Sequence, residues 1–423
     1  LCSRVTHSPT NEIHTVRGMH MSERASVPKE DTEEQTTTTE IETGADAAVA
    51  ALENAGVENL FGVQGGAIMP VYDALYEHEE MSHYTMAHEQ GAVHAADAYG
   101  IVTGDPGVCM ATSGPGATNL VTGIADANMD SDPLIALTGQ VPTDFVGNDA
   151  FQETDTIGVT QPITKYNIFA DDSDTVGQDV GEAWALANEG RQGPTLVDLP
   201  KDVTNGETDT EAAVAETPET YNPPTTADEV IVEEAAKALS NAERPAILAG
   251  GGVIKGEACD ELREFAREYE IPVLTTMPGT GAYPEDDPLS QGIAGMHGTG
   301  YANLAISNCD VLVGVGTRFD DRLTGDIETF APDAEIIHVD IDPAEISKNV
   351  EADYPLIGDA GIVLDQLDDE MSGTPPADEW REQCQTWKDE YPLDYDMPED
   401  DPMKPQYVVE KYDELTPDDT IVA

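Results

Sequence analysis

Cysteine and long apolar runs are both scarce in this sequence. Its 423 residues include five cysteines, which are widely scattered and form no CxxC pair: Cys2, Cys109, Cys259, Cys309 and Cys384. This spacing excludes a zinc ribbon and a disulfide scaffold, and it favours a reducing cytoplasm. No apolar run approaches the roughly 18 residues that a membrane-spanning helix needs, which excludes a membrane protein.

Positively charged residues are also scarce. Lysine and arginine number 19 against 84 aspartates and glutamates, so the formal net charge is −65. Such a chain repels nucleic-acid phosphates, which excludes DNA or RNA binding. Hydrophobic residues still make up 39% of the chain, enough for real cores. We therefore expect a folded, halophile-like protein whose carboxylate-covered surface suits a salt-rich cytoplasm, where ions screen the repulsion.

The two ends of the chain differ from the rest. Residues 1–20 hold two arginines against one glutamate, the chain begins with Leu1, and Met21 is a candidate start. Residues 22–40 are polar and low in complexity, so we expect 1–40 to be a disordered or spurious extension. The last residues, 418–423, have the composition of a strand, and we expect them to begin a truncated third domain.

Between the two ends, apolar runs typical of buried strands alternate with helical patterns. This alternation predicts an α/β fold with successive doubly wound parallel sheets. The runs predict strands at 59–66, 106–112, 133–140, 194–200, 243–253, 271–276, 309–316 and 335–342. Composition shifts predict domains at 41–203 and 229–371, an acidic linker at 204–228, a Pro- and Asp-rich linker at 372–404, and the start of a third domain at 405–423.

Four histidines, at positions 78, 83, 88 and 94, lie within 17 residues. A metal site is one interpretation of such a cluster. However, the segment contains no HExxH motif and no histidine pair four residues apart on one helix. We therefore interpret them as surface and packing histidines, and we expect no metal ligands in this chain.

Glu89 begins a predicted helix of small residues. A carboxyl group in an apolar pocket can exchange a proton near neutral pH, whereas an acid at a helix N-terminus is stabilised by the helix dipole alone. The residues themselves leave both readings open. The scarce cations Lys201 and those of the RFDDR segment (318–322) could hold an anion or form ordinary ion pairs with Asp320 or Asp321.

Three glycine-rich loops follow predicted strands, at 113–119, 249–256 and 314–319. Each could be a tight turn, or it could let backbone N–H groups approach an anion or a ring. The second and third loops lie in one Rossmann-like block, and together they fit a dinucleotide-binding crevice better than either does alone.

Taken together, these segments resemble the thiamine-diphosphate-dependent enzymes, and most closely the family of acetolactate synthase catalytic (large) subunits. The resemblance runs in order over about residues 41–423. AFQE with RFDDR separates this family from related oxidases and decarboxylases. It rests on FGVQGGAIMPVYDAL (61–75), AHEQGAVHAADAYG (87–100), TSGPGATN (112–119), LTGQVP (137–142), DAFQETD (149–155), GPTLVDLPKDV (193–203), AGGGV (249–253), GMHGTGYAN (295–303), VGTRFDDRLTG (315–325) and HVDIDPAEI (338–346).

The resemblance implies a carboligase that decarboxylates pyruvate and joins the two-carbon unit to a second 2-keto acid, pyruvate or 2-ketobutyrate. This is the first common step of branched-chain amino acid (valine, leucine, isoleucine) biosynthesis. The implied cofactors are thiamine diphosphate, Mg²⁺ and a structural FAD. The implied domains are pyrimidine-binding (41–203), FAD-binding (229–371) and diphosphate-binding (from 405). Alternatives are another enzyme of this superfamily, such as a pyruvate oxidase or glyoxylate carboligase, or a non-catalytic FAD-binding protein.

The resemblance also implies roles for particular residues. Glu89 matches the glutamate that hydrogen-bonds the cofactor's aminopyrimidine ring, and Arg322 matches the residue that holds the second keto acid's carboxylate, a task suited to a planar guanidinium. Four residues match positions around the reacting carbon: Gly66, Phe151, Gln152 and Lys201. The implied cofactor-binding residues of the first domain are Thr112, Ser113, Gly114 and Asn119. Those lining FAD are Arg191, Gly250, Gly251, Gly252, Met296, His297, Gly298, Arg318, Asp340 and Asp359.

The sequence departs from the family pattern in two places. Gln64 stands where many relatives have proline. Relatives also hold a metal ion through a Gly-Asp-Gly motif and a later asparagine, but Gly358-Asp359 is followed by Ala360, and no asparagine follows Asn349. We therefore expect the metal and diphosphate site to be missing, and this chain alone to be inactive. The resemblance further implies a homodimer or tetramer with shared active sites, and a small regulatory subunit.

Overall fold

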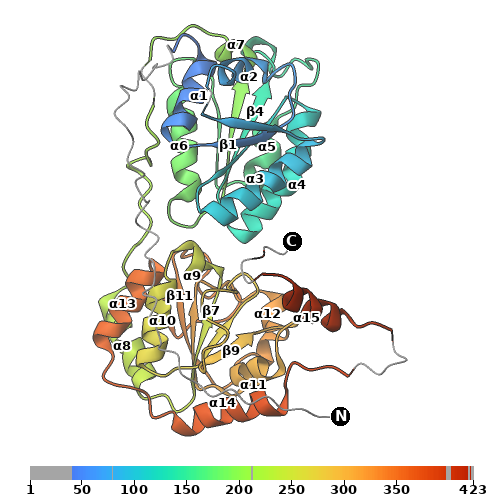
Figure 1. The fold of residues 1–423 in the computed structure, drawn as a ribbon. Helices are drawn as coiled ribbons and strands as arrows, with labels where there is room; N and C mark the ends of the chain where they lie inside the picture. Colours follow the sequence, from blue (N-terminus) through green and yellow to red (C-terminus); the bar gives the residue numbers. More distant parts are fainter. Residues whose placement is uncertain (1–40, 79, 211–212, 397–401, 418–419, 421–423) are drawn as a thin grey trace, which may run out of the picture. The chain divides into compact units, whose positions relative to one another are not determined.

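The computed structural model describes residues 41–423 apart from 79, 211–212, 397–401, 418–419 and 421–423. The expected extension at 1–40 and almost all of the expected strand at 418–423 therefore lie outside the described residues. The described part of the chain contains two parallel six-stranded sheets with helices packed against them, as the alternating strand and helix patterns predict (Figure 1). Among the described residues, no helix combines the length and the apolar character needed to cross a membrane.

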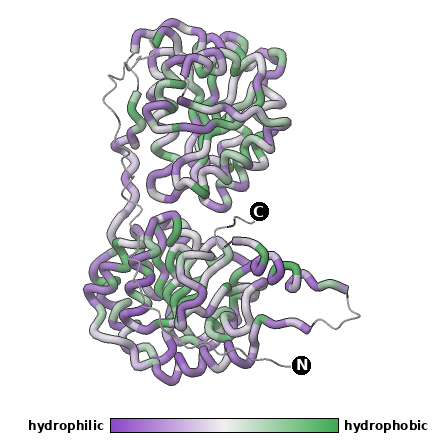
Figure 2. The backbone as a smooth tube through the Cα atoms, in the orientation of Figure 1, coloured by the Kyte–Doolittle hydropathy of each residue, from purple (hydrophilic) through white to green (hydrophobic). Residues whose placement is uncertain are grey.

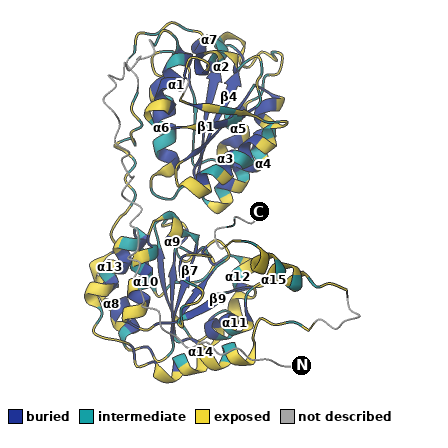
Figure 3. Cartoon of the chain, viewed as in Figure 1, coloured by how far each residue is buried: buried dark blue, intermediate teal, exposed yellow. Residues whose placement is uncertain are grey.

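The first sheet has the strand order β2-β1-β3-β4-β6-β5. The bounds are β1 Asn59–Gly62, β2 Ser82–Thr85, β3 Gly107–Ala111, β4 Leu134–Gln140, β5 Tyr166–Phe169 and β6 Pro194–Pro200. Every residue of β3, β4 and β6 is buried, since both faces of the sheet are covered by helices. Figure 3 shows these central strands in the buried colour and the outer helix faces exposed.

Successive residues of a strand pack into different hydrophobic cores, one on each face of the sheet. Ile135 and Leu137 of β4 pack with α1 and α6, whereas Leu134 and Ala136 pack with α3 and α4. This alternation follows from the two-residue period of a strand. The helices of this part are α1 Gly44–Asn54, α2 Met69–Leu75, α3 Glu89–Thr103, α4 Pro115–Asp130, α5 Thr156–Thr160, α6 Val176–Asn188 and α7 Lys201–Thr204, with 3₁₀ turns at Thr143–Phe145 and Gln161–Ile163.

The second sheet has the order β12-β11-β10-β7-β8-β9. Its strands are β7 Pro245–Ala249, β8 Val273–Thr275, β9 Ser290–Ile293, β10 Val311–Val315, β11 Glu335–Asp340 and β12 Tyr354–Ile357. One face packs against α8, α10 and α13, and the other against α11 and α14. Figure 2 shows the hydrophobic residues concentrated along the strands of both sheets. The helices are α8 Glu229–Ser240, α9 Gly251–Lys255, α10 Cys259–Glu268, α11 Gly300–Asn308, α12 Asp321–Thr324, α13 Ala360–Glu370, α14 Asp378–Glu390 and α15 Pro405–Leu415, with a 3₁₀ turn at Ile327–Thr329.

The stretch 372–404, expected as a linker, differs from that expectation because it contains α14. Trp380 and Cys384 on this helix are buried in the second sheet's core, and the Trp380 indole N–H donates to the carbonyl of Pro245 at 2.9 Å. The abundant acids of α14 hid the few apolar positions that anchor it. The other expected linker, 204–228, begins with Thr204, which is the last residue of α7, and its remaining described residues contain no helix or strand element.

Candidate functional site

Each sheet has a topological switch point, where successive strands depart in opposite directions. In the first sheet it lies between β1 and β3, and in the second between β7 and β10. Ligands of open α/β sheets bind at the carboxyl ends of the strands beside such a point. The glycine-rich segments 64–66 and 113–116 follow β1 and β3, and 250–252 and 316 follow β7 and β10. The glycine loops thus lie where the fold favours ligand binding.

Thr112 joins the two loops of the first switch point. Its hydroxyl accepts a hydrogen bond from the Ala67 backbone N–H at 3.1 Å. A Cβ atom added to Gly65 would lie 2.5 Å from the Thr112 methyl carbon, so only glycine fits there. Gly66 differs, because a Cβ added there would meet no atom within 4 Å. Gly66 therefore borders open space next to the loop that holds Thr112.

Glu89 is positioned by two helices. It lies in the first turn of α3, after His88, whose ring nitrogen caps the helix by accepting from the Gln90 N–H at 3.1 Å. Asn119 of α4 donates from Nδ2 to Glu89 Oε2 at 2.9 Å. Glu89 is half-buried. The helix-terminus reading is thus observed, and Asn119 adds a second constraint that a dipole alone would not supply.

The Glu89 carboxylate also faces the glycine loop before α4. A Cβ atom added to Gly116 would lie 3.5 Å from Glu89 Oε1. Since Asn119 holds Oε2, the second oxygen is directed towards a backbone that carries no side chain. This arrangement can present a carboxylate oxygen to a flat polar ring lying against the loop.

Phe151 and Gln152 lie in the loop after β4. Gln152 adopts a left-handed backbone conformation with φ +57°, and its carbonyl oxygen would be 2.5 Å from a Cβ on Gly114. The structure therefore brings Gln152 against Gly114 of the 113–119 loop. Phe151 is 86% exposed and borders a hollow with Val141 and Phe145. Such strain and exposed apolar surface are typical of binding loops.

Lys201 begins α7 at the carboxyl end of β6. Among the described ion pairs, none involves Lys201, whereas its neighbour Asp202 accepts hydrogen bonds from Thr143. A lysine that makes no ion pair with the described residues, in a chain with 84 acidic residues, can hold an anion. Ser113, the remaining predicted residue of the first loop, is buried.

At the second switch point, glycines let two backbones approach closely. A Cβ on Gly250 would overlap the carbonyl of Gly316, and one on Gly252 would lie 2.7 Å from the Gly316 Cα. A Cβ on Gly251 would lie 3.0 Å from Pro278. Loop-to-loop packing thus requires these glycines whether or not a ligand binds beside them.

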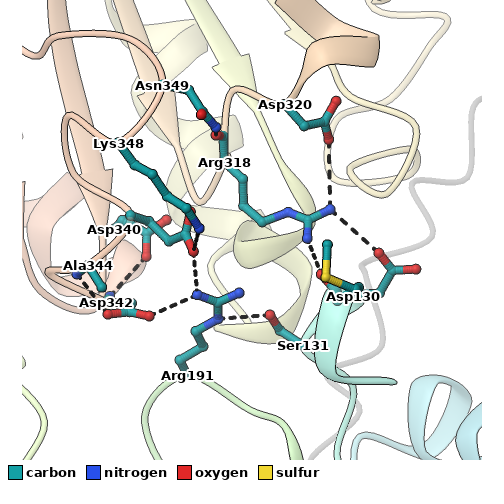
Figure 4. Close-up of polar contacts among 12 residues, drawn as sticks. Asp130, Ser131, Arg191, Arg318, Asp320, Asp340, Asp342, Ala344, Lys348 and Asn349 are labelled. Atoms are coloured by element: carbon teal, nitrogen blue, oxygen red, sulfur yellow. Dashed lines mark hydrogen bonds and ion pairs between the residues drawn. The ribbon is translucent and has the colours of Figure 1, made fainter. Parts of the chain in front are cut away.

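Arg191 and Arg318 form the polar contacts drawn in Figure 4. Arg191 donates to Asp342 at 2.8 Å, to Glu345 at 2.6 Å and to Ser131 at 2.9 Å. Burial alone would raise the pKa of the Glu345 carboxyl, but hydrogen bonds from Lys348 and Arg191 outweigh burial and lower that pKa. This arginine is therefore held in a network of carboxylates.

Arg318 donates to the Met129 carbonyl and lies 3.5 Å from Asp130 and 3.7 Å from Asp320. The ion pair with Asp320 that the sequence left open is observed. Both arginines join residues of the first-sheet part to residues around the second sheet, as does the Lys255–Asp132 pair.

The remaining residues predicted to line FAD lie at the carboxyl edge of the second sheet. Asp340 ends β11, and burial raises the pKa of its carboxyl to about 6. Asp359 follows β12 and caps α13, accepting from the backbone N–H groups of Gly361 and Ile362. Met296 and His297 are exposed after β9, and Gly298 is tightly enclosed, because a Cβ there would lie 2.6 Å from the Ala294 carbonyl carbon.

Arg322 is exposed and lies beside Met296. Its Nη1 atom is 4.0 Å from the Met296 sulfur, and the Met296 N–H donates to the Arg322 carbonyl at 2.8 Å. None of the described contacts of Arg322 reaches Glu89. The predicted residues therefore fall into two groups, one in the segments that follow strands of the first sheet and one around the second sheet.

The four histidines do not form one cluster. His78 is buried and bonded to Glu53 at 2.9 Å, His83 is bonded to the Tyr72 hydroxyl at 2.9 Å, and His88 caps α3. These are the packing and surface roles expected from the sequence. His94 instead lies beside two carboxylates, which the histidine spacing could not reveal.

A buried polar network was also missed. Asp198 of β6 is 1% exposed and accepts from Thr138 at 2.7 Å and from Gln140 at 2.9 Å. Burial raises the pKa of its carboxyl to about 6. Its only sequence signal is one acid inside an otherwise apolar strand, PTLVDLP.

The residue ranges that form the two sheets each match the model of a known protein domain. Residues 42–159 match the thiamine pyrophosphate enzyme N-terminal TPP binding domain, and 232–367 match the thiamine pyrophosphate enzyme central domain. The chain is 52% identical over 328 residues to a probable acetolactate synthase large subunit of Methanocaldococcus jannaschii, covering 77% of this chain and 55% of that protein.

Two further relatives cover more of the chain. An acetolactate synthase large subunit of Corynebacterium glutamicum is 47% identical over 372 residues, 87% of this chain and 59% of that protein. An acetolactate synthase of Mycobacterium bovis is 46% identical over 388 residues, 90% of this chain and 63% of that protein. The chain thus spans between 55% and 63% of the length of these three relatives.

Proposed function

Since this chain belongs to the thiamine pyrophosphate enzymes, in the acetolactate synthase large-subunit family, we propose that it forms part of an acetolactate synthase. The reaction would decarboxylate pyruvate and join the two-carbon unit to pyruvate or 2-ketobutyrate, the first common step towards valine, leucine and isoleucine. The single observation that carries this proposal is the Glu89 carboxylate, which is held by Asn119 and faces Gly116 of the 113–119 loop.

The groups around Glu89 fit the aminopyrimidine ring of thiamine diphosphate. When bound, this cofactor supplies a nucleophilic carbon and an electron sink for decarboxylation. Glu89 would hold a proton at one ring nitrogen through Oε1, while Asn119 fixes Oε2 and so orients the carboxylate. Thr112, Ser113 and Gly114 would provide the surface against which the ring lies. Phe151 and Gln152 would cover the reacting carbon and exclude water.

We also propose that Lys201 and Arg322 hold substrate carboxylates. Both residues carry a cation that makes no ion pair among the described residues. Arg322 offers a planar fork of donors, which suits a 2-keto acid better than a point charge does. Since Arg322 and Glu89 are not in contact in this chain, Arg322 would act on the second keto acid only in the assembled site.

An FAD site at the second sheet is a further proposal. Gly250, Gly251 and Gly252 lie beside the switch point, and Met296, His297 and Gly298 lie in the loop after β9. Asp340 ends β11 at the same edge of the sheet. A hollow nearby is lined by four of the 19 cations, Lys165, Arg191, Arg318 and Lys348, together with the carboxylates of Asp342 and Glu345. The cations outnumber the carboxylates there, so an anionic ligand is favoured over a cationic one. These features support a dinucleotide, with FAD as the expected one.

The described residues do not fit a Mg²⁺-diphosphate site. The aspartate of the Gly358-Asp359 pair is used to cap α13, and the following residue is Ala360. We therefore assign no Mg²⁺ ligand and no diphosphate contact to this chain. The metal, the homodimer or tetramer with shared sites, and the small regulatory subunit are proposals that rest on the family alone.

The cytoplasm is the compartment that we infer for this protein. Four cysteines, Cys109, Cys259, Cys309 and Cys384, are free thiols, which a reducing compartment maintains. A net charge of −65 further favours a salt-rich cytoplasm.

The proposal predicts that Glu89→Gln abolishes synthesis of 2-acetolactate. The assembled holoenzyme would be assayed with pyruvate, thiamine diphosphate, Mg²⁺ and FAD. An amide cannot exchange a proton with the ring, so the turnover number should fall by roughly 10²–10⁴-fold. Glu77→Gln, an exposed amide substitution after α2 in the same part of the chain, is the matched control and should leave turnover unchanged.

Three outcomes would contradict the proposal. Full turnover in Glu89→Gln would remove the assigned role of the carboxylate. Release of acetaldehyde or acetyl phosphate in place of acetolactate would point to another enzyme of the superfamily. A purified protein without flavin absorbance would refute the FAD site while leaving the Glu89 assignment intact.

A further inference from the structure

Three potential metal ligands converge between α3 and α4. His94 and Asp97 lie one turn apart on α3, and Asp126 lies on the adjacent helix α4. One ligand atom from each residue lies within 4.8 Å of those of the other two. The helices that carry these residues are also those that carry Glu89 and Asn119, but the three ligands are separate from that pair.

The spacing of the ligand atoms suits a small cation. His94 Nδ1 lies 3.6 Å from Asp126 Oδ2. Two ligand atoms about 2.0 Å from a tetrahedral zinc ion are roughly 3.3 Å apart, so the His94–Asp126 pair needs to close by only a few tenths of an ångström. The ligand atom of Asp97 lies within 4.8 Å of both and would need the larger side-chain adjustment. Side chains at i and i+3 lie on one helix face, which lets His94 and Asp97 bind the same ion.

Asp97 provides an independent sign that a ligand is needed. It is 7% exposed, and its Oδ1 atom is buried with no hydrogen-bond partner among the described residues. Buried carboxylates are normally paired or bound to metal. Burial, together with the nearby carboxylates of Asp132 and Asp126, raises the pKa of Asp97 to about 7.

The charges around Asp97 leave it without a neutralising partner. Asp126, Asp130 and Asp132 all raise its proton affinity, and Lys255 is the cation that opposes them. Lys255, however, is bonded to Asp132. The His94 side chain and Asp126 are 38% and 58% exposed, so a cation can reach the cluster from solvent.

We propose that His94, Asp97 and Asp126 form a site for a divalent transition-metal ion, with Zn²⁺ as the reference ion. An imidazole ligand favours zinc or a neighbouring transition metal over Mg²⁺ and Ca²⁺, which prefer oxygen alone. The ion would be bound by one nitrogen and two carboxylate oxygens, leaving a position for water. It would tie α3 to α4 and neutralise the buried Asp97 carboxylate.

The test is metal binding by the full chain in molar KCl with millimolar Mg²⁺, which suppresses weak binding to surface carboxylates. Zn²⁺ bound after equilibrium dialysis should be about one ion per chain. Co²⁺ should give visible ligand-field bands without a thiolate charge-transfer band. Asp126→Asn should weaken Zn²⁺ binding by at least about tenfold, because it removes a charged ligand from an exposed position.

Asp73→Asn is the matched control, since Asp73 is an exposed aspartate of the same part of the chain and lies outside the cluster. It should bind Zn²⁺ as the unmodified chain does. His94→Ala gives a second, independent loss of binding. Equal binding by Asp126→Asn, His94→Ala and the unmodified chain would overturn the proposal, as would a cobalt–thiolate band, which would place the ion on a cysteine.

Discussion

The Asp97 carboxylate is buried and has no hydrogen-bond or ion-pair partner among the described residues. Because its pKa in the folded chain is about 7, above an unfolded value near 3.9, the folded state binds the proton more tightly. The contribution of this group to stability is therefore fully present at low pH and is lost as pH rises from about 4 to about 7. Above that range, the metal-free chain carries an unfavourable buried charge.

Asp97→Asn should remove this pH dependence. In a metal chelator and molar KCl, the gain in unfolding free energy over the unmodified chain should be larger at about pH 8 than at about pH 5, by roughly 2–3 kcal/mol. Comparing the two pH values cancels the constant cost of burying an amide. Denaturant unfolding would measure the difference, and an equal effect at both pH values would show that Asp97 keeps an ordinary pKa.

The sequence draws attention to Glu89 as a candidate site residue but not to Asp97. Glu89 stands in a recognisable segment, next to a glycine loop, and its partner Asn119 lies in that loop's own motif. Asp97 looks like an ordinary polar position of a small-residue helix. Its burial and its proximity to Asp126 arise from the packing of α3 on α4, and no periodicity within either segment specifies that contact.

At the scale of elements, the predicted and missed strands differ systematically. The apolar runs predicted the four inner strands of each sheet, whereas β2, β5, β9 and β12 were missed. These four are the edge strands of the two sheets. An inner parallel strand is buried on both faces and reads as a continuous apolar run, but an edge strand such as SHYT in β2 is partly exposed and carries no such signal.

Two glycines of α3, Gly91 in its first turn and Gly100 near its end, offer a matched pair for a prediction about helix packing. Gly91 is exposed, and an added Cβ would meet only the end of Met86 at 3.9 Å. Gly91→Ala should raise the unfolding free energy by about 0.5–1 kcal/mol, because alanine is the better helix former. Gly100 is buried, and a Cβ there would overlap the Pro133 carbonyl.

Gly100→Ala should therefore lower the unfolding free energy by roughly 1–3 kcal/mol despite the same gain in helix propensity. Denaturant titration of both variants in molar KCl would measure the two effects. The prediction depends on opposite signs within one helix. If both substitutions stabilised the chain, α3 would not pack against the 133–134 segment as closely as the structure has it.

At the scale of the whole molecule, three of the scarce cations connect distant segments of the chain. Arg191, Lys255 and Arg318 each contact a carboxylate more than 120 residues away in the sequence. Most of the 84 acidic residues have no such partner among the described ion pairs. The fold is thus held by its cores and a few long-range pairs against a large net repulsion.

Ionic strength should decide the balance between these two electrostatic effects. Salt weakens exposed ion pairs, but it also screens the repulsion among the carboxylates, and the second effect involves far more charges. The screening length falls from about 10 Å at 0.1 M to about 3 Å at 1 M. At 1 M it is therefore shorter than the distance between neighbouring surface charges. We therefore expect the thermal midpoint to rise from millimolar to molar KCl, and the fold to loosen at the low end.

Circular dichroism of the full chain across that KCl series would measure the effect. Sucrose at matched osmolality is the control, because it stabilises by exclusion from the surface without screening charge. Sucrose without KCl should not reproduce the rise in the thermal midpoint that KCl causes. Identical spectra and midpoints in millimolar and molar KCl would contradict the prediction. Such a result would mean that protons or bound cations, rather than mobile salt, neutralise the acidic surface, and the site at His94, Asp97 and Asp126 would be the first place to look for one.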